Sequence, residues 1–190
     1  MAGARGWGMA AVLAGALALI FPLQAAELSG TRQVILSNAQ GERVPIATVA
    51  FEPAGAGRWR FTLQLDESRF GEHFLAMRPF KCLTGARQQL CHFPYASEQV
   101  VAADDLVPLE YALMFLHTKP AAVNVDARNG VYYRLRWKGS GAPGAIEGKL
   151  YDVDMDPIVV PQGDRRRPIR SEHLIAADED SHWLPRLSIE

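Results

Sequence analysis

The chain has 190 residues, of which 48% are hydrophobic and 22% charged, and its formal net charge is −1. This composition excludes a disordered chain, and the length suits one domain or at most two. Because 20 basic residues are balanced by 21 acidic ones, the chain has no basic field that would attract nucleic acid, and we expect no nucleic-acid partner. Its 12 prolines and 16 glycines disfavour a bundle of long helices.

Residues 1–26 have the layout of a secretory signal peptide. Arg5 supplies a positive start, residues 7–21 form an almost uninterrupted apolar run, and Pro22 ends that run ahead of two small residues. The run of about 15 residues is shorter than the ~20 needed to span a bilayer. We therefore favour cleavage near Ala25 or Ala26 over an uncleaved anchor. The mature chain has no second stretch that could span a membrane, so the sequence predicts one periplasmic or secreted domain over residues 27–190.

Several segments have the patterns of β-strands. Residues 33–37 and 43–51 are short runs rich in β-branched and apolar side chains, and residues 58–66 alternate between apolar and polar. Alternation with a period of two is typical of a strand with one buried face. Short turns between neighbouring runs favour an antiparallel meander. Further strands are expected in three later ranges, 131–137, 146–153 and 183–189, and Pro185 favours an edge position for the last of them.

One segment, residues 105–117, predicts a helix. Asp105 can cap its N-terminus, Pro108 then falls in the first turn, where a missing N–H costs nothing, and Pro120 ends the segment. Leucines recur at helical spacing and most other positions are also apolar, so this helix should be buried. We therefore predict an α+β, β-rich fold: an antiparallel meander sheet, either open or rolled into a partial barrel, with one main helix (about 105–117) packed on it.

The two cysteines, Cys82 and Cys91, predict a disulfide. In an exported protein a lone pair of this kind is typically oxidised, and turn-forming residues lie between the two. A redox pair is the first alternative, but the C-x-x-C spacing is absent. A zinc site with His92 is the second, but neighbours on a strand point to opposite faces. The favoured geometry is a β-hairpin that turns near residues 85–88.

Residues 70–95 are unusually rich in aromatic and basic side chains. Aromatic residues beside cations, on a hairpin held by a disulfide, suit a contact with a ligand or protein. The alternative is the core face of a hairpin with a basic outer face, because aromatic residues dominate ordinary cores. The candidate binding surface comprises Phe74, Arg78, Phe80, Lys81, His92 and Tyr95.

Three carboxylates, Asp152, Asp154 and Asp156, recur at every second position and would share one side of an extended chain. Their oxygens suit a Ca²⁺ ion, although Pro157 stands where an EF-hand loop requires glycine. These three aspartates are the candidate metal ligands. The alternative is a solvated strand end paired with the arginines at 165–167.

Two strings of the sequence carry a resemblance to known sequences. They are Glu72-His73-Phe74-Leu75-Ala76-Met77-Arg78-Pro79-Phe80-Lys81-Cys82 and Cys91-His92-Phe93-Pro94-Tyr95, accompanied by residues 28–32, 103–106 and 183–187. Together they resemble a family of uncharacterised exported proteins of Gram-negative bacteria. The resemblance covers most of the mature chain and implies a periplasmic or secreted location. It implies no activity and no functional residues.

No motif in the chain identifies an enzyme. The sequence contains neither G-x-S-x-G nor H-E-x-x-H, and its G-x-G-x-x-G match at residues 139–144 opens no predicted helix, so we expect no cofactor. A catalytic group assembled from distant residues stays open, because geometry defines such sites. The leading hypothesis is a non-enzymatic periplasmic domain that binds a hydrophobic ligand or an envelope protein. The alternatives are a hydrolase or metal-dependent enzyme that uses acids such as Asp152 and Asp154 with a histidine, and a structural envelope protein.

Overall fold

A computed structural model describes residues 3, 28–55, 57–75, 78–122, 126, 128–139, 144–161 and 163–190. For Phe74, Leu75, Arg78 and Val159 it describes the backbone alone. Apart from Gly3, the predicted signal peptide and its cleavage site lie outside the described residues and stay predictions. No helix in the described ranges combines the length and the apolar character needed to cross a membrane.

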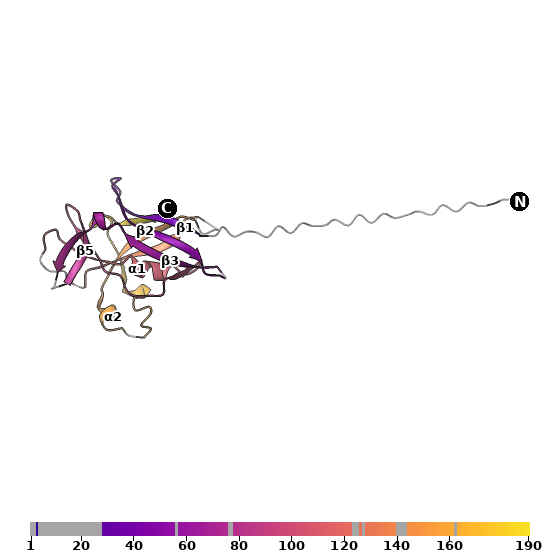
Figure 1. The fold of residues 1–190 in the computed structure, drawn as a ribbon. Helices are drawn as coiled ribbons and strands as arrows, with labels where there is room; N and C mark the ends of the chain where they lie inside the picture. Colours follow the sequence, from indigo (N-terminus) through magenta and orange to yellow (C-terminus); the bar gives the residue numbers. More distant parts are fainter. Residues whose placement is uncertain are drawn as a thin grey trace.

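The described part of the chain forms one antiparallel sheet of twelve strands (Figure 1). The strands are β1 (Gly30–Ser37), β2 (Arg43–Pro53), β3 (Arg58–Leu65), β4 (Gly71–Leu75), β5 (Arg78–Thr84), β6 (Gln89–His92), β7 (Val100–Ala102), β8 (Phe115–Thr118), β9 (Gly130–Trp137), β10 (Ile146–Val153), β11 (Leu174–Ala176) and β12 (Arg186–Ile189). Their order in the sheet is β4-β5-β6-β8-β9-β10-β12-β1-β2-β3-β7, and β11 pairs with β10 outside this path. The prediction of a β-rich, antiparallel fold is confirmed.

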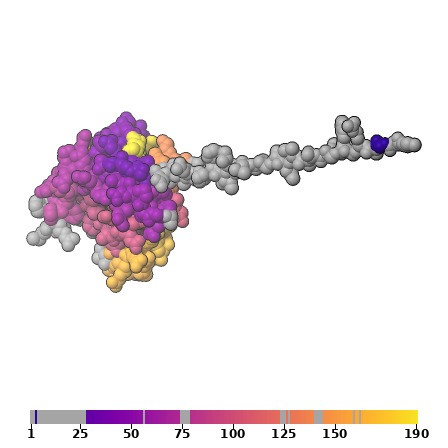
Figure 2. Space-filling view, turned by 45° about the vertical axis from the view of Figure 1, so that its right-hand side comes forward, coloured from indigo at the N-terminus to yellow at the C-terminus, as the bar shows by residue number. Residues whose placement is uncertain are grey.

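The last strand joins the two halves of the sheet. β12 lies between β10 and β1, and Figure 2 shows the yellow C-terminal end of the chain against the indigo first strand. The expected edge position of this strand is therefore wrong. Pro185 lies just before the strand, where its missing N–H leaves no gap in the ladder, and its carbonyl accepts the Leu150 N–H (3.1 Å).

The sheet curls strongly but does not close. Four strands separate β3 from β9 in the sheet order, yet the ring centroids of Trp59 on β3 and Trp137 on β9 are only 6.3 Å apart. The inner face of the curl holds the larger hydrophobic core, to which Phe51, Phe61 and Tyr133 contribute fully buried rings. Burial of this apolar face drives the curl, because alternating strands bury one face only when the sheet folds over it.

A second, smaller core lies on the opposite face of the sheet. Tyr111, Met114, Leu116, Tyr132 and other buried residues form it, together with side chains of the segment after β10. That segment includes a short helix, α2 (Asp156–Val159), which lies below α1 in Figure 1. The start of β8 and the first half of β9 are therefore covered on both faces.

The expected helix over residues 105–117 is matched only in part. Helix α1 covers Val107–Ala112, and residues Phe115–Thr118 form β8 instead. In β8 Phe115 faces the larger core and Leu116 the smaller one. A strand buried on both faces is apolar throughout, and periodicity cannot separate such a strand from a buried helix. With α2 this makes two short α-helices in the described chain, besides the 3₁₀ turns Glu67–Arg69 and Ser171–His173.

Helix α1 completes an unpaired edge of β9 through a buried carboxylate. β8 pairs with β9 only at its first residues, Gly130 and Val131, so the Leu135 N–H has no strand partner there. Glu110 of α1 is 5% exposed, and its Oε1 accepts this N–H at 2.7 Å, while its Oε2 accepts the Tyr132 hydroxyl. Burial raises the pKa of Glu110, although both hydrogen bonds oppose the shift.

The predicted disulfide is confirmed. Cys82 on β5 and Cys91 on β6 face each other directly across the hairpin with a Cα–Cα distance of 4.0 Å. The turn closes where expected, with the Gly85 N–H donating to the Gln88 carbonyl at 2.9 Å. With both sulfurs bonded to each other, the zinc alternative with His92 is excluded. Closing so short a loop should contribute about 2.5–3 kcal/mol of stability.

Candidate functional site

A polar cluster stands at one end of the inner face of the curled sheet. Along β10, Leu150 faces the larger core, and Asp152 lies two residues further on the same face. Along β8, Phe115 and His117 repeat this relation. The core face of both strands therefore ends in side chains that can bind protons or ligands, where the curl opens to solvent.

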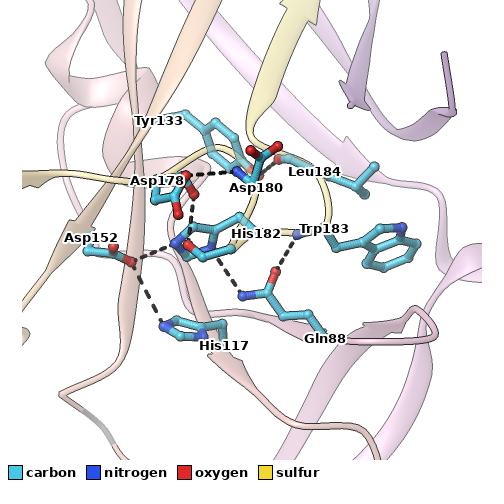
Figure 3. A network of polar contacts seen from close by, with 10 residues as sticks. Gln88, His117, Tyr133, Asp152, Asp178, Asp180, His182, Trp183 and Leu184 are labelled. Atoms are coloured by element: carbon cyan, nitrogen blue, oxygen red, sulfur yellow. Dashed lines mark hydrogen bonds and ion pairs between the residues drawn. The ribbon is translucent and has the colours of Figure 1, made fainter. Parts of the chain in front are cut away.

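His182, in the loop before β12, is the centre of the cluster (Figure 3). It is 4% exposed. The Trp183 N–H donates to Gln88 Oε1 at 3.0 Å, so the Gln88 amide turns its NH₂ group to His182 Nδ1, 3.1 Å away. Nδ1 is thus an acceptor, and the ring proton is on Nε2, which donates to Asp152 Oδ1 at 3.0 Å.

His117 lies beside this pair and faces the same carboxylate. Its Nε2 is 4.0 Å from Asp152 Oδ1, and its ring centroid is 5.3 Å from that of His182. Burial and the neighbouring His182 lower the pKa of His117, while Asp152 acts in the opposite direction. The His117 imidazole is therefore neutral at pH 7 and able to donate or accept a hydrogen bond.

This geometry orients Asp152 rather than activating His182. In a catalytic triad, one ring nitrogen of histidine binds the carboxylate and the other faces the nucleophile. Here Gln88 occupies the position of the nucleophile, so His182 has no nitrogen left for proton transfer. What remains open to a ligand is the Asp152 carboxylate, 37% exposed, with the His117 ring next to it.

A hollow of about 400 Å³ lies in front of these two side chains. Ile175 on β11 lines it and stands directly opposite Asp152 in the strand register. Its side chain is 64% exposed, one of two large hydrophobic side chains so exposed in the described ranges. The hollow therefore combines an exposed apolar side chain, Ile175, with a carboxylate, Asp152, whose orientation is set by His182. Binding sites typically combine apolar surface with a few oriented polar groups.

The three candidate metal ligands are not brought together. Asp152 belongs to the cluster, Asp154 Oδ1 accepts the N–H of Asp156 at 2.9 Å, and Asp156 pairs with Arg128 at 3.9 Å. Within the described residues, no group of three or more His, Cys, Asp or Glu side chains is arranged to hold a metal ion. The chain leaves the extended conformation after Val153, so the spacing of two no longer aligns the carboxylates.

Four members of the candidate binding surface have partners within the protein. Phe80 stacks on Phe93 with ring centroids 6.2 Å apart, and the Tyr95 hydroxyl donates to the Arg165 carbonyl. His92 Nε2 donates to the Ala112 carbonyl at 2.8 Å, and burial lowers the pKa of His92. The ammonium of Lys81 binds Glu72 at 2.9 Å.

Phe80 and Lys81 are neighbours on β5 and point to opposite faces, so the six residues do not form one continuous patch. The side chains of Phe74 and Arg78 lie outside the described residues. Whether any of the six contacts a partner stays a prediction.

Sequence reasoning named only Asp152 from the cluster and missed His117, His182 and Gln88. In β10 a polar residue, Asp152, follows the buried Leu150 at a spacing of two, which marks the position where a core face reaches solvent. In β8 burial on both faces hides the same relation between Phe115 and His117, so no periodic signal marks His117. Gln88 and His182 come from a turn and a loop, and no periodic signal announces them.

Comparisons with known proteins give no relative: no protein-family model, no curated protein and no solved structure matches this chain. The resemblance to exported proteins of Gram-negative bacteria therefore stays a prediction.

Proposed function

We propose that this chain is a non-enzymatic binding domain that is periplasmic or secreted. We further propose that the hollow at Asp152 binds a basic group of its ligand. The observation that carries the proposal is the Asp152 carboxylate, held from behind by a buried imidazole and exposed toward the hollow. A carboxylate in a fixed orientation binds a cation without the entropy loss of ordering the side chain on binding.

Charge and shape around the carboxylate favour a cation on an apolar stem. Asp154 also lines the hollow, and Arg128, the one arginine that lines it among the described residues, is paired with Asp156. His117, neutral at pH 7, adds no competing charge. Ile175 offers apolar contact beside Asp152, which suits the methylene chain of a lysine, an arginine or an alkylamine.

Location follows the same proposal. The Cys82–Cys91 disulfide supports an oxidising compartment, because such bonds are rare in the cytosol. The signal peptide expected over residues 1–26 would deliver the chain there. The ligand is then a basic small molecule or a basic side chain of an envelope protein.

A matched pair of probes tests the proposal: N-acetyl-lysine methylamide and N-acetyl-norleucine methylamide, which differ in the ammonium group. Chemical shift changes in ¹H–¹⁵N spectra give both affinities. We expect the lysine probe to bind about tenfold more tightly to the wild type, and Asp152→Asn to remove most of this difference. Asn keeps an acceptor for His182, so the variant should stay folded. Glu72→Gln, which removes an exposed carboxylate elsewhere, is the control for net charge.

Two results would contradict the proposal. One is equal binding of the two probes by the wild type. The other is turnover of ester or phosphoester substrates that Asp152→Asn abolishes, which would support the hydrolase alternative. Ile175→Ala provides an independent check, because its exposed side chain can be shortened without loss of stability. This variant should lower the affinity for both probes to a similar extent.

A further inference from the structure

The outer face of the sheet carries a row of basic side chains in direct register. Lys149 on β10 pairs with Arg134 on β9 and with Arg186 on β12. The row continues through Ser37 on β1, which pairs with Arg186, to Arg43 on β2. Directly opposed residues on antiparallel strands point to the same face with Cβ atoms about 5 Å apart. The row therefore holds four cations and one serine across five strands.

These cations border a hollow of about 590 Å³, separate from the one at Asp152. Among the described residues, six basic and three acidic side chains line it. Each of the three carboxylates is already bound by an arginine: Glu147 by Arg136 at 2.7 Å, Glu179 by Arg186 at 2.8 Å, and Glu190 by Arg43.

The remaining three cations are Arg134, Lys138 and Lys149. Among the side chains that the structure describes, no carboxylate lies within 4 Å of any of them. Arg134 attracts the buried Glu110 only from a longer distance. All three are exposed, and Lys138, directly after β9, lines the same hollow as Arg134.

Like charges directly opposite one another destabilise a sheet. The Arg134–Lys149 pair therefore costs stability unless an anion lies between the two side chains. A phosphate group suits this position better than a carboxylate, because it has close to two negative charges at neutral pH and three acceptor oxygens. The guanidinium can bind two of those oxygens and the ammonium the third. Ser37 and Tyr151 line the same hollow with hydroxyl groups.

We propose that this hollow is a binding site for a phosphate group, with Arg134 and Lys149 as its principal ligands. The hollow is much larger than a phosphate ion, so the group arrives as a phosphomonoester on a larger molecule. The site lies on the outer face of the sheet and involves none of the residues at Asp152. A negative result for this site would therefore leave the function proposed for the hollow at Asp152 unaffected.

Calorimetric titration of the full domain with glycerol 3-phosphate tests the site, with succinate as the carboxylate dianion for comparison. We expect the wild type to bind glycerol 3-phosphate at least about tenfold more tightly than succinate. Arg134→Gln and Lys149→Gln should each weaken that binding by about tenfold. Arg58→Gln removes an exposed cation of β3, distant in the sheet order, and should bind like the wild type. Arg134 and Lys149 are both exposed, so their variants should fold, and circular dichroism verifies this.

Vesicles of phosphatidylcholine with and without phosphatidic acid distinguish a lipid headgroup from a free phosphomonoester. Sedimentation only with phosphatidic acid, lost in Lys149→Gln, would assign the phosphate to a lipid. Binding of glycerol 3-phosphate without sedimentation would assign it to a small molecule. The proposal is wrong if the wild type binds neither probe, if succinate binds equally well, or if Arg58→Gln weakens binding as much as Lys149→Gln.

Discussion

Replacing Glu110 with alanine should destabilise the fold by about 2–6 kcal/mol. The side chain is 5% exposed, and its two oxygens accept the Leu135 N–H and the Tyr132 hydroxyl. Alanine leaves both donors buried without an acceptor, and each such group costs about 1–3 kcal/mol. Because burial raises the pKa of Glu110, the wild type already loses some stability by burying this carboxylate at neutral pH. The net loss should therefore fall in the lower half of the range.

Urea unfolding followed by tryptophan fluorescence measures this loss, since Trp59 and Trp137 pack together beside the larger core. A natural domain has roughly 5–15 kcal/mol of stability in total, so the midpoint of unfolding should shift clearly. Glu72→Ala is the matched control, because Glu72 is an exposed carboxylate whose partner is also at the surface, and its midpoint should stay close to that of the wild type. Equal midpoints for the two variants would refute the bridging role of Glu110.

The free energy of unfolding should also depend on pH through Glu110, and it should fall when a methyl group is added at Gly148. Since burial raises the pKa of Glu110 above its ordinary 4.5, the folded chain binds more protons than the unfolded one. This contribution is complete below pH 4.5 and is lost as the pH rises through the folded-state pKa. Relative to Glu110→Gln, the wild type should lose stability from pH 4.5 toward neutral pH in urea unfolding, and a flat difference would contradict the assignment. Gly148→Ala should cost about 1–3 kcal/mol, because its Cβ would lie 2.8 Å from Leu135 Cδ2 and 3.1 Å from Leu187 Cβ. Unchanged thermal unfolding would mean that the sheet relaxes around the added methyl group.

The parts of the fold that the sequence predicted best depend on contacts between neighbours in the chain. The alternation over residues 58–66 matches β3, and the turn between Cys82 and Cys91 brings the two sulfurs together because only a short hairpin separates them. In both cases the pairing partner is near in sequence, so a local pattern contains the information. The boundary between α1 and β8 was missed, since burial on both faces removed the periodic signal.

The candidate site depends on contacts between distant segments. His182 and Asp152 lie 30 positions apart, and His182 and Gln88 are separated by 94. The sequence pattern grouped Asp152 with Asp154 and Asp156, its neighbours along the chain. The fold instead groups it with two histidines, because the strand ends at Val153 and the loop before β12 returns to this end of the sheet.

The sequence alone determined that this chain is β-rich and that a disulfide closes one of its hairpins. Side-chain alternation and cysteine spacing are local properties, which do not depend on how distant segments pack together. Only the tertiary structure decided that β12 lies between β10 and β1, that a carboxylate of α1 completes the edge of β9, and that Lys149 faces Arg134 and Arg186. The physical reason is burial: the position of each of these groups depends on how the whole apolar face of the sheet curls away from water, and no single segment contains that face.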